Sequence, residues 1–336
     1  MCKWILIFLV LCSKVSFSQS NVSFSAIDWS VQSVDAPNVE TLAHKLTDPY
    51  HTDLEKVRAI FSWIASHISY NVSIYNRRPS VYKYSYDPAD TITLSKSPDQ
   101  MVADRVLRRR IAVCDGYSRL FKILCDYSGI KAEIISGYAR CNMDYKVRFR
   151  TNHIWNAVMV DNAWHLLDVT WGSGYINYAD EYVAHLDEYY FLTPPSQFSQ
   201  DHYPENPKWL LLDALPFRRE FKNAPFKYKT FVKYSITSFH PNNGVIEASV
   251  GDTVKIELET RDLERDKRIS SDPFFDSTIL TGSPSWAFLN PAHVEGNKIY
   301  YYFIVDSYQT EWLHILYNDD IILQYKLNIV NKTVRK

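Results

Sequence analysis

A helix followed directly by three strand-rich segments restricts the fold of this 336-residue chain most strongly. The helix is predicted from about Cys114 to Tyr127, because apolar side chains recur there at helical spacing and Gly129 follows as a typical end. Segments 131–140, 152–160 and 163–170 are rich in Ile, Val, Trp and Tyr, which predicts strands. A helix packed on an antiparallel sheet is an α+β arrangement.

The last two predicted strands are joined at residues 161–162, an Asp-Asn pair that fits a two-residue hairpin turn. Such a turn places Trp155 opposite Asp168, so that His153 and Asp168 become diagonal neighbours on one face of the sheet. Diagonal neighbours lie about 7–8 Å apart at the backbone, within reach of an imidazole–carboxylate hydrogen bond. The same register sends His165 to the opposite face. A three-residue loop would change this register.

Cys114 stands at the predicted start of its helix, where unpaired N–H groups and the helix dipole favour an anion and therefore the thiolate. Together with His153 and Asp168 it supplies a nucleophile, a general base and a group that orients the base. Each residue also has a structural interpretation, because free cysteines and single histidines are often parts of a core. Cys125, three helical turns further on, is assigned to packing.

The residues around these three positions resemble a known family. The stretches CDGYSRLFKILCDYSGIKAEIISGYA and NHIWNAVMVDNAWHLLDVTWG are similar to the core of the transglutaminase-like superfamily, particularly its bacterial and kyphoscoliosis-peptidase-like members. The upstream stretch DLEKVRAIFSWIASHISYN resembles the helix that precedes this core. The resemblance covers roughly residues 50–195, and the C-terminal part of the chain lies outside it.

The resemblance implies a papain-like fold with Cys114 as nucleophile on the core helix, and with His153 as base and Asp168 as orienting acid on the sheet. Family members differ in activity: some cross-link or deamidate glutamine side chains, some cleave peptide or isopeptide bonds, and some are scaffolds. Trp155 and Trp171 are expected to line the substrate groove, with core packing as the alternative. No cofactor is expected, and no Cys or His pair has the spacing of metal ligands.

The predicted function is cysteine-dependent acyl transfer on peptide or protein amide bonds through a thioester. Hydrolysis is favoured over transglutamination or deamidation, because water is always present and the sequence indicates no dedicated amine site. The alternative is a non-catalytic binding or scaffold protein, in which a C-terminal domain recruits a cell-surface protein or a glycan.

Two groups of residues before Cys114 have open roles. Trp63 and Tyr70 precede it at distances that make them candidate donors to an oxyanion. A basic run ends just before the cysteine and would either favour the thiolate, hold an acidic peptide, or form a solvated face: Arg105, Arg108, Arg109 and Arg110.

The first residues have the features of a signal peptide over 1–18, which predicts a secreted, periplasmic or cell-surface protein. The apolar run Trp4–Leu11 is too short to span a bilayer, and lipidation at Cys12 is the alternative form of export. The formal charge of the whole chain is −1, and loss of Lys3 and Lys14 with the leader makes it −3. A nucleic-acid partner is therefore not expected.

The rest of the chain predicts two domains. The transglutaminase-like core with its N-terminal helices occupies 19–200, a linker follows over 201–230, and a β-sandwich of immunoglobulin-like type occupies 231–336. Thr52 and Glu55 form a capping-box pattern before a helix that ends near Ile68. Residues 71–100 are predicted to be a long surface excursion. The C-terminal strands are expected at 232–239, 245–249, 253–259, 298–304 and 312–329, the last with a break at 318–320.

Overall fold

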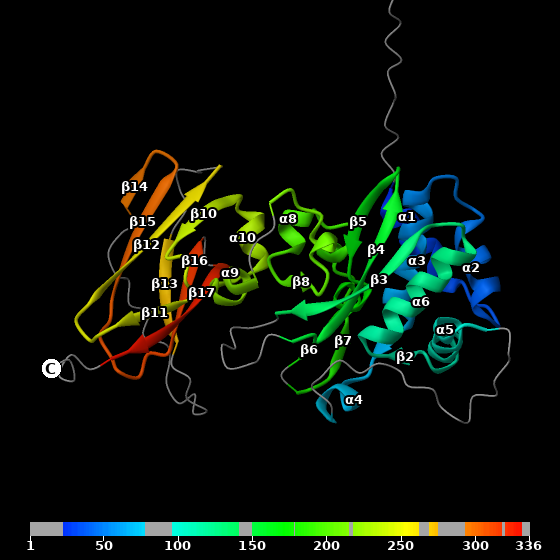
Figure 1. Ribbon diagram of the computed structural model, residues 1–336, viewed down its shortest axis with the longest axis horizontal. Helices are drawn as coiled ribbons and strands as arrows, with labels where there is room; N and C mark the ends of the chain where they lie inside the picture. The colour runs from blue at the N-terminus through cyan, green and yellow to red at the C-terminus, as the bar shows by residue number, and fades with distance from the viewer. Residues whose placement is uncertain are drawn as a thin grey trace, which may run out of the picture.

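The computed structural model has a helix-and-sheet part and an all-strand part that follows it in the chain (Figure 1). It describes residues 23–77, 96–140, 150–177, 179–214, 218–261, 269–274, 293–317 and 320–330, with the backbone alone for 75–77 and 269–274. The predicted leader, Cys12, Cys141 and most of the predicted 71–100 excursion lie outside the described residues. None of the described helices combines the length and apolar character needed to cross a bilayer.

Helices form one layer of the N-terminal part. Their bounds are α1 Phe24–Ser30, η1 Val31–Ser33, α2 Val39–Thr47, α3 Asp53–His67, α4 Val72–Arg77, α5 Pro98–Arg109 and α6 Cys114–Tyr127. The predicted capping box is present, since Thr52 and Glu55 exchange hydrogen bonds at the start of α3. The predicted bounds of α6 are confirmed. The α5 helix was not expected, although Ser97 and Gln100 form a second capping box before it.

A four-stranded antiparallel sheet packs on these helices, in the order β5-β4-β3-β8. Its strands are β3 Ala132–Ala139, β4 His153–Val160, β5 Ala163–Leu167 and β8 His202–Pro204. Buried apolar residues of α3, α5 and α6 share one core with β4 and β5. Asn156 on β4 fixes α6 against the sheet, because its amide donates to the carbonyls of Ser118 and Glu133 at 3.1 Å each.

The hairpin between β4 and β5 has the predicted two-residue turn and register. Asp161 and Asn162 have φ values of 50° and 61°, as a type I′ turn requires, and Asn156 pairs with Leu167. The prediction of strand through residue 170 is wrong, because β5 ends at Leu167. Asp168 ends the strand by accepting hydrogen bonds from two following backbone N–H groups, which starts the short helix α7 Val169–Gly172.

Short elements connect this sheet to the C-terminal strands. They are β1 Ser69–Tyr70, β2 Ile111–Ala112, β6 Gly174–Ile176, β7 Tyr182–Ala184, η2 Glu188–Tyr190, α8 Pro195–Phe198, η3 Pro207–Leu210, α9 Arg218–Asn223, β9 Phe226–Lys227 and α10 Lys229–Lys233. The segment 201–230, predicted as a linker, therefore contains helices and strands. The strand predicted at 232–239 begins only at Ile236, because α10 occupies the preceding residues.

The C-terminal strands form two sheets over a shared apolar core. One sheet has the order β10-β12-β15-β14, and the other has the order β11-β17-β16-β13 with β9 added beside β17. The strands are β10 Ile236–His240, β11 Val245–Ala248, β12 Thr253–Thr260, β13 Ile269–Phe274, β14 His293–Glu295, β15 Lys298–Ile304, β16 Trp312–Tyr317 and β17 Asp320–Ile329. The positions predicted for β11, β12, β15, β16 and β17 are confirmed to within a residue or two.

A buried arginine bonds the two parts to each other. The guanidinium of Arg140, directly after β3, donates to the carbonyls of Phe221, Ala224 and Pro225 at 3.2, 3.0 and 2.7 Å. The next residues form β9, which pairs with β17 in the C-terminal part. The end of the core sheet is thus linked to the C-terminal strands through backbone carbonyls that Arg140 satisfies.

We expect Gly137→Ala to destabilise the sheet. A Cβ at Gly137 on β3 would lie 2.3 Å from Trp155 and 2.4 Å from the carbonyl oxygen of Tyr203, so β8 could not keep its place. Overpacking of this kind costs about 1–3 kcal/mol of unfolding free energy, measurable by urea denaturation. Ser136→Ala on the same strand is the control. Equal unfolding free energies for the two variants would contradict the close packing of β8.

Candidate functional site

Asp168 is the fixed centre of a buried polar cluster. It lies between β5 and α7 and is 0% exposed. Its Oδ1 accepts hydrogen bonds from the backbone N–H groups of Thr170 and Trp171 at 2.9 and 3.1 Å. These two bonds hold the carboxylate plane, so that Oδ2 is free to face side chains on the neighbouring strands.

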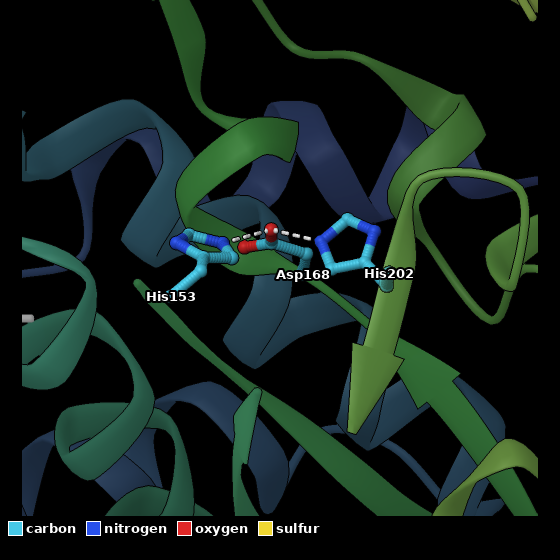
Figure 2. Close-up of side chains that lie close together, drawn as sticks. All are labelled: His153, Asp168 and His202. Carbon is cyan, nitrogen blue, oxygen red and sulfur yellow. Dashed lines mark hydrogen bonds and ion pairs between the residues drawn. The ribbon is translucent and has the colours of Figure 1, made fainter. Parts of the chain in front are cut away.

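His153, the first residue of β4, donates from Nε2 to Oδ2 of Asp168 over 2.6 Å (Figure 2). Burial alone would lower the pKa of His153. The Asp168 charge and hydrogen bond, with a further contribution from Cys114, raise the pKa to about 10 instead. The opposite change occurs at Asp168: burial would raise its pKa, but His153 and a second histidine hold it well below the ordinary value. The pair is therefore an imidazolium–carboxylate pair at neutral pH.

Cys114 is the first residue of α6 and is 5% exposed. After Asp168, Cys114 is a further cause of the raised pKa of His153, which indicates that the thiol lies close to that imidazole. Since Nε2 of His153 is bonded to Asp168, the nitrogen available to the thiol is Nδ1. The helix start, the sheet and the end of β5 thus bring together the three residues that the sequence analysis selected.

A second histidine, His202 on β8, completes the cluster and was not predicted. Its Nε2 lies 3.2 Å from Oδ2 of Asp168, so one carboxylate oxygen serves two imidazoles (Figure 2). No pattern in the sequence indicated this contact, because β8 is three residues long and joins the sheet beside β3, more than 30 residues after Asp168. His165, by contrast, pairs with Val158 and lies outside the cluster, as predicted from the register.

Comparison with known proteins identifies the family that part of this chain resembles. Residues 40–169 match the family model described as the transglutaminase-like superfamily. The chain contains a transglutaminase-like domain. The matched residues include Cys114, His153 and Asp168, and they end before His202.

Several proteins share wider similarity with this chain. Mouse kyphoscoliosis peptidase is 31% identical over 245 residues, which cover 71% of this chain and 34% of that protein. Hillarin of Drosophila melanogaster is 28% identical over 246 residues, which cover 67% of this chain and 27% of that protein. A solved TGase structure is 20% identical, covers 52% of this chain and 40% of that chain, and has a TM-score of 0.28. The chain spans about a third or less of the length of the curated relatives it matches.

Aromatic rings surround His153 and His202. Trp171 lies with its ring centroid 5.2 Å from His153 and 4.7 Å from His202. Trp155 lies 6.1 and 4.9 Å from the same two rings. Trp171 is half-buried, whereas Trp155 is 1% exposed and offers a ligand almost no surface in this structure. A role for either residue in a substrate groove stays a prediction.

One of the two candidate oxyanion donors of the transglutaminase-like domain is excluded. Trp63 is buried and its indole N–H donates to the carbonyl of Val34 at 2.8 Å, so it has no hydrogen to give to an oxyanion. Tyr70 lies in β1 and is half-buried, with its ring 6.4 Å from that of Tyr117. These contacts leave Tyr70 as a candidate donor to the oxyanion.

The basic run before Cys114 divides into buried and solvated residues. Arg105 is 7% exposed, and Arg110 donates to Asp35 at 2.6 Å. Arg108 and Arg109 are exposed, as expected for a solvated face.

The histidines and Asp168 are also the one group in the described part of the chain whose composition and spacing would suit a metal ion, with ligand atoms within 4.8 Å of one another. Those atoms are hydrogen-bonded to each other, at 2.6 and 3.2 Å, so each already has a partner.

A separate hollow of about 480 Å³ opens beside β8 and is lined by Tyr138, Arg150, Thr151, Tyr203, Pro204, Glu205 and Arg218.

We expect the stability contributed by the imidazolium of His153 to depend on pH. Because folding raises the pKa of this group from an ordinary 6.5 to about 10, its contribution is complete below about pH 6.5 and is lost as the pH rises towards 10. The difference in unfolding free energy between the wild type and His153→Gln should therefore shrink between pH 6 and pH 10. Urea denaturation across this range measures it, and a constant difference would contradict the ion pair.

Proposed function

We propose that this protein is a cysteine-dependent acyl transferase acting on peptide or protein amide bonds, with hydrolysis favoured over transfer to an amine. The observation that carries the proposal is the buried bond between Nε2 of His153 and Asp168, which leaves Nδ1 to the thiol at the start of α6. A nucleophile, a base and an orienting carboxylate in this order are the groups that such chemistry needs.

Before the reaction starts, the imidazolium of His153 already holds on Nδ1 the proton that the Cys114 thiol has given up, so the nucleophile is a thiolate beside an imidazolium. The thiolate then attacks the carbonyl carbon of the substrate amide, and His153 returns the proton to the nitrogen of the leaving amine. The carbon–nitrogen bond breaks and a thioester forms. Asp168 stays ionised and stabilises the imidazolium, because its pKa is held far below neutral pH.

The second half releases the acyl group. His153, neutral after giving its proton to the amine, takes a proton from water as the water attacks the thioester. The carbon–sulfur bond breaks, the acid product leaves, and the thiolate of Cys114 and the imidazolium of His153 are restored. A primary amine in place of water would give a transamidated product. We favour water because the described residues include no feature that we can assign to amine binding. The word peptidase in the names of the mammalian relatives points the same way.

Electrostatic support for the tetrahedral intermediate is expected from the start of α6. The first N–H groups of a helix have no partner within it, and the helix dipole favours negative charge there. The amide of Cys114 lies in this first turn, next to the reacting sulfur.

The hollow beside β8 is lined by Arg150, Arg218 and Glu205, so a substrate bound there would meet both positive and negative side chains.

The C-terminal strands and the leader define the setting that we propose. We take the two sheets over one core to be a sandwich of immunoglobulin-like type, which would recruit a cell-surface protein or a glycan. The predicted signal peptide supports a mature protein that is secreted, periplasmic or at the cell surface. Both statements extend the sequence-based predictions.

Iodoacetamide labelling of Cys114 against pH tests the proposed nucleophile. The wild type should label rapidly at pH 6–7, because His153 stabilises the thiolate, whereas His153→Ala should label like an ordinary thiol with a pKa of about 8.5. Peptide mass spectrometry separates Cys114 from Cys125, which is 0% exposed with a pKa that burial raises well above normal. Cys125 therefore serves as an internal control for unfolding. If both proteins label slowly and alike, the scaffold alternative replaces the enzyme.

A peptide library tests the acceptor. Incubation of the protein with the library should give new peptide termini in buffer alone, and these should persist when a primary amine is added. Cys114→Ser should lower the rate by on the order of 10³-fold or more, as losses of nucleophiles do. Incorporation of the amine without hydrolysis would identify a transglutaminase instead of a peptidase. Mass spectrometry distinguishes the two products.

A further inference from the structure

His202 stands outside the three residues that define the proposed reaction, yet it is the most enclosed titratable group beside them. It is the first residue of β8, pairs with Ala139 at the sheet edge, and is 0% exposed. Four aromatic rings surround the imidazole, with centroids 4.2–6.0 Å from it: Trp155, Trp171, Tyr190 and Phe198. The ring is therefore held in one orientation and cannot reach a substrate.

Both ring nitrogens of His202 meet carboxylates. Nε2 lies 3.2 Å from Oδ2 of Asp168, and Nδ1 lies 2.6 Å from Oδ1 of Asp201. A neutral imidazole has a single N–H donor and could satisfy one of these oxygens, whereas the protonated ring satisfies both. Hydrogen bonds to both carboxylate oxygens at once therefore require the second proton on the ring. In that form His202 lies as a cation between the two carboxylates.

The same contacts complete the hydrogen bonding of Asp168. Its four bonds come from the backbone N–H groups of Thr170 and Trp171 on Oδ1, and from His153 and His202 on Oδ2. Without His202 the oxygen that faces His153 would lose the bond that fixes it from the opposite side (Figure 2). Asp168 and Asp201 would then be two buried carboxylates without the cation between them, which is strongly unfavourable.

We propose that His202 is a positioning residue for the Cys114–His153–Asp168 site: its cation lies between Asp168 and Asp201 and keeps the Asp168 carboxylate directed at His153. The inference rests on the proposed function. It extends the site through β8 to Asp201, whose Oδ2 accepts a hydrogen bond from the hydroxyl of Tyr190 at 3.2 Å. The group therefore runs from α6 through β4, α7 and β8 to η2.

Loss of the His202 charge should change the titration of the site. The titratable groups that face His202 are Asp168 before α7, Asp201 before β8, His153 on β4 and Tyr190 on η2. Burial would lower the pKa of His202, but Asp201 and Asp168 raise it. Removing this positive charge disfavours the nearby thiolate of Cys114 and loosens Asp168. Both effects move thiolate formation to higher pH.

The variant His202→Gln tests this, because glutamine can still donate to Asp168 but has no charge. We expect the midpoint of Cys114 labelling by iodoacetamide to rise by about one pH unit, so that the rate is about tenfold lower at pH values below both midpoints. The same substitution at the half-buried His165, outside the cluster, is the matched control and should leave the profile unchanged. In an Asp168→Asn background, His202→Gln should cause a smaller further shift than it does in the wild type, because the part that acts through Asp168 is already lost.

Three results would overturn the inference. The labelling profile of His202→Gln could equal that of the wild type. Cys114 and the buried Cys125 could both label faster at every pH, which would show that His202 only keeps the fold closed. A chelator could change wild-type labelling, with zinc restoring it, which would make the cluster a metal site. Slow wild-type labelling that His153→Ala does not alter is a separate outcome and would refute the proposed function, and the inference with it.

A measurement on the wild-type protein needs no variant to fold. Nitrogen-15 NMR of the imidazoles at pH 7 should show both ring nitrogens of His202 protonated. A neutral tautomer with one N–H would overturn the inference.

Asp201→Asn gives a second variant, in which Nδ1 of His202 keeps an acceptor of the same shape but loses the negative charge beside it. Its labelling midpoint should move in the same direction as that of His202→Gln, by a smaller amount, and an unchanged midpoint would count against the cation.

Discussion

The carboxylate of Asp168 is the constraint on which the rest of the site depends. It is completely buried, and a buried carboxylate is stable only when its oxygens are fully hydrogen-bonded. The start of α7 supplies two bonds and two histidines supply two more. His153 lies on β4, His202 lies on β8, and the two N–H groups belong to α7. The carboxylate therefore holds these three elements together. The pKa shifts of His153 and Asp168 are the electrostatic result.

The polar residues of the site lie at the ends of helices and strands. Asp168 stops β5 and starts α7, and Cys114 starts α6 with its sulfur at the positive end of the helix. Gly137 gives β8 room to approach β3, which brings His202 to the sheet edge. Arg140 then binds the carbonyls that follow, so the position of β8 is coupled to the start of the C-terminal part.

The sequence predicted most of the features that depend on residues close together in the chain. The capping box at Thr52, the helix from Cys114 and the two-residue turn at 161–162 depend on neighbours in the chain, and all were predicted. The strand expected through residue 170 was wrong, because the side chain of Asp168 competes for the backbone N–H groups that a strand would need. The α5 helix was overlooked although its capping box was readable.

The sequence by itself therefore determined that a two-residue turn at 161–162 puts His153 and Asp168 on one face, since the side chains of a strand alternate with a period of two. The structure decided that the turn has two residues. Only the tertiary structure decided that His202 and His153 both bond to Oδ2 of Asp168. It also decided that the indole N–H of Trp63 donates to the carbonyl of Val34. Those contacts join segments about 30 residues apart. Their geometry is set by how β8 and the N-terminal helices pack, and local periodicity has no access to that packing.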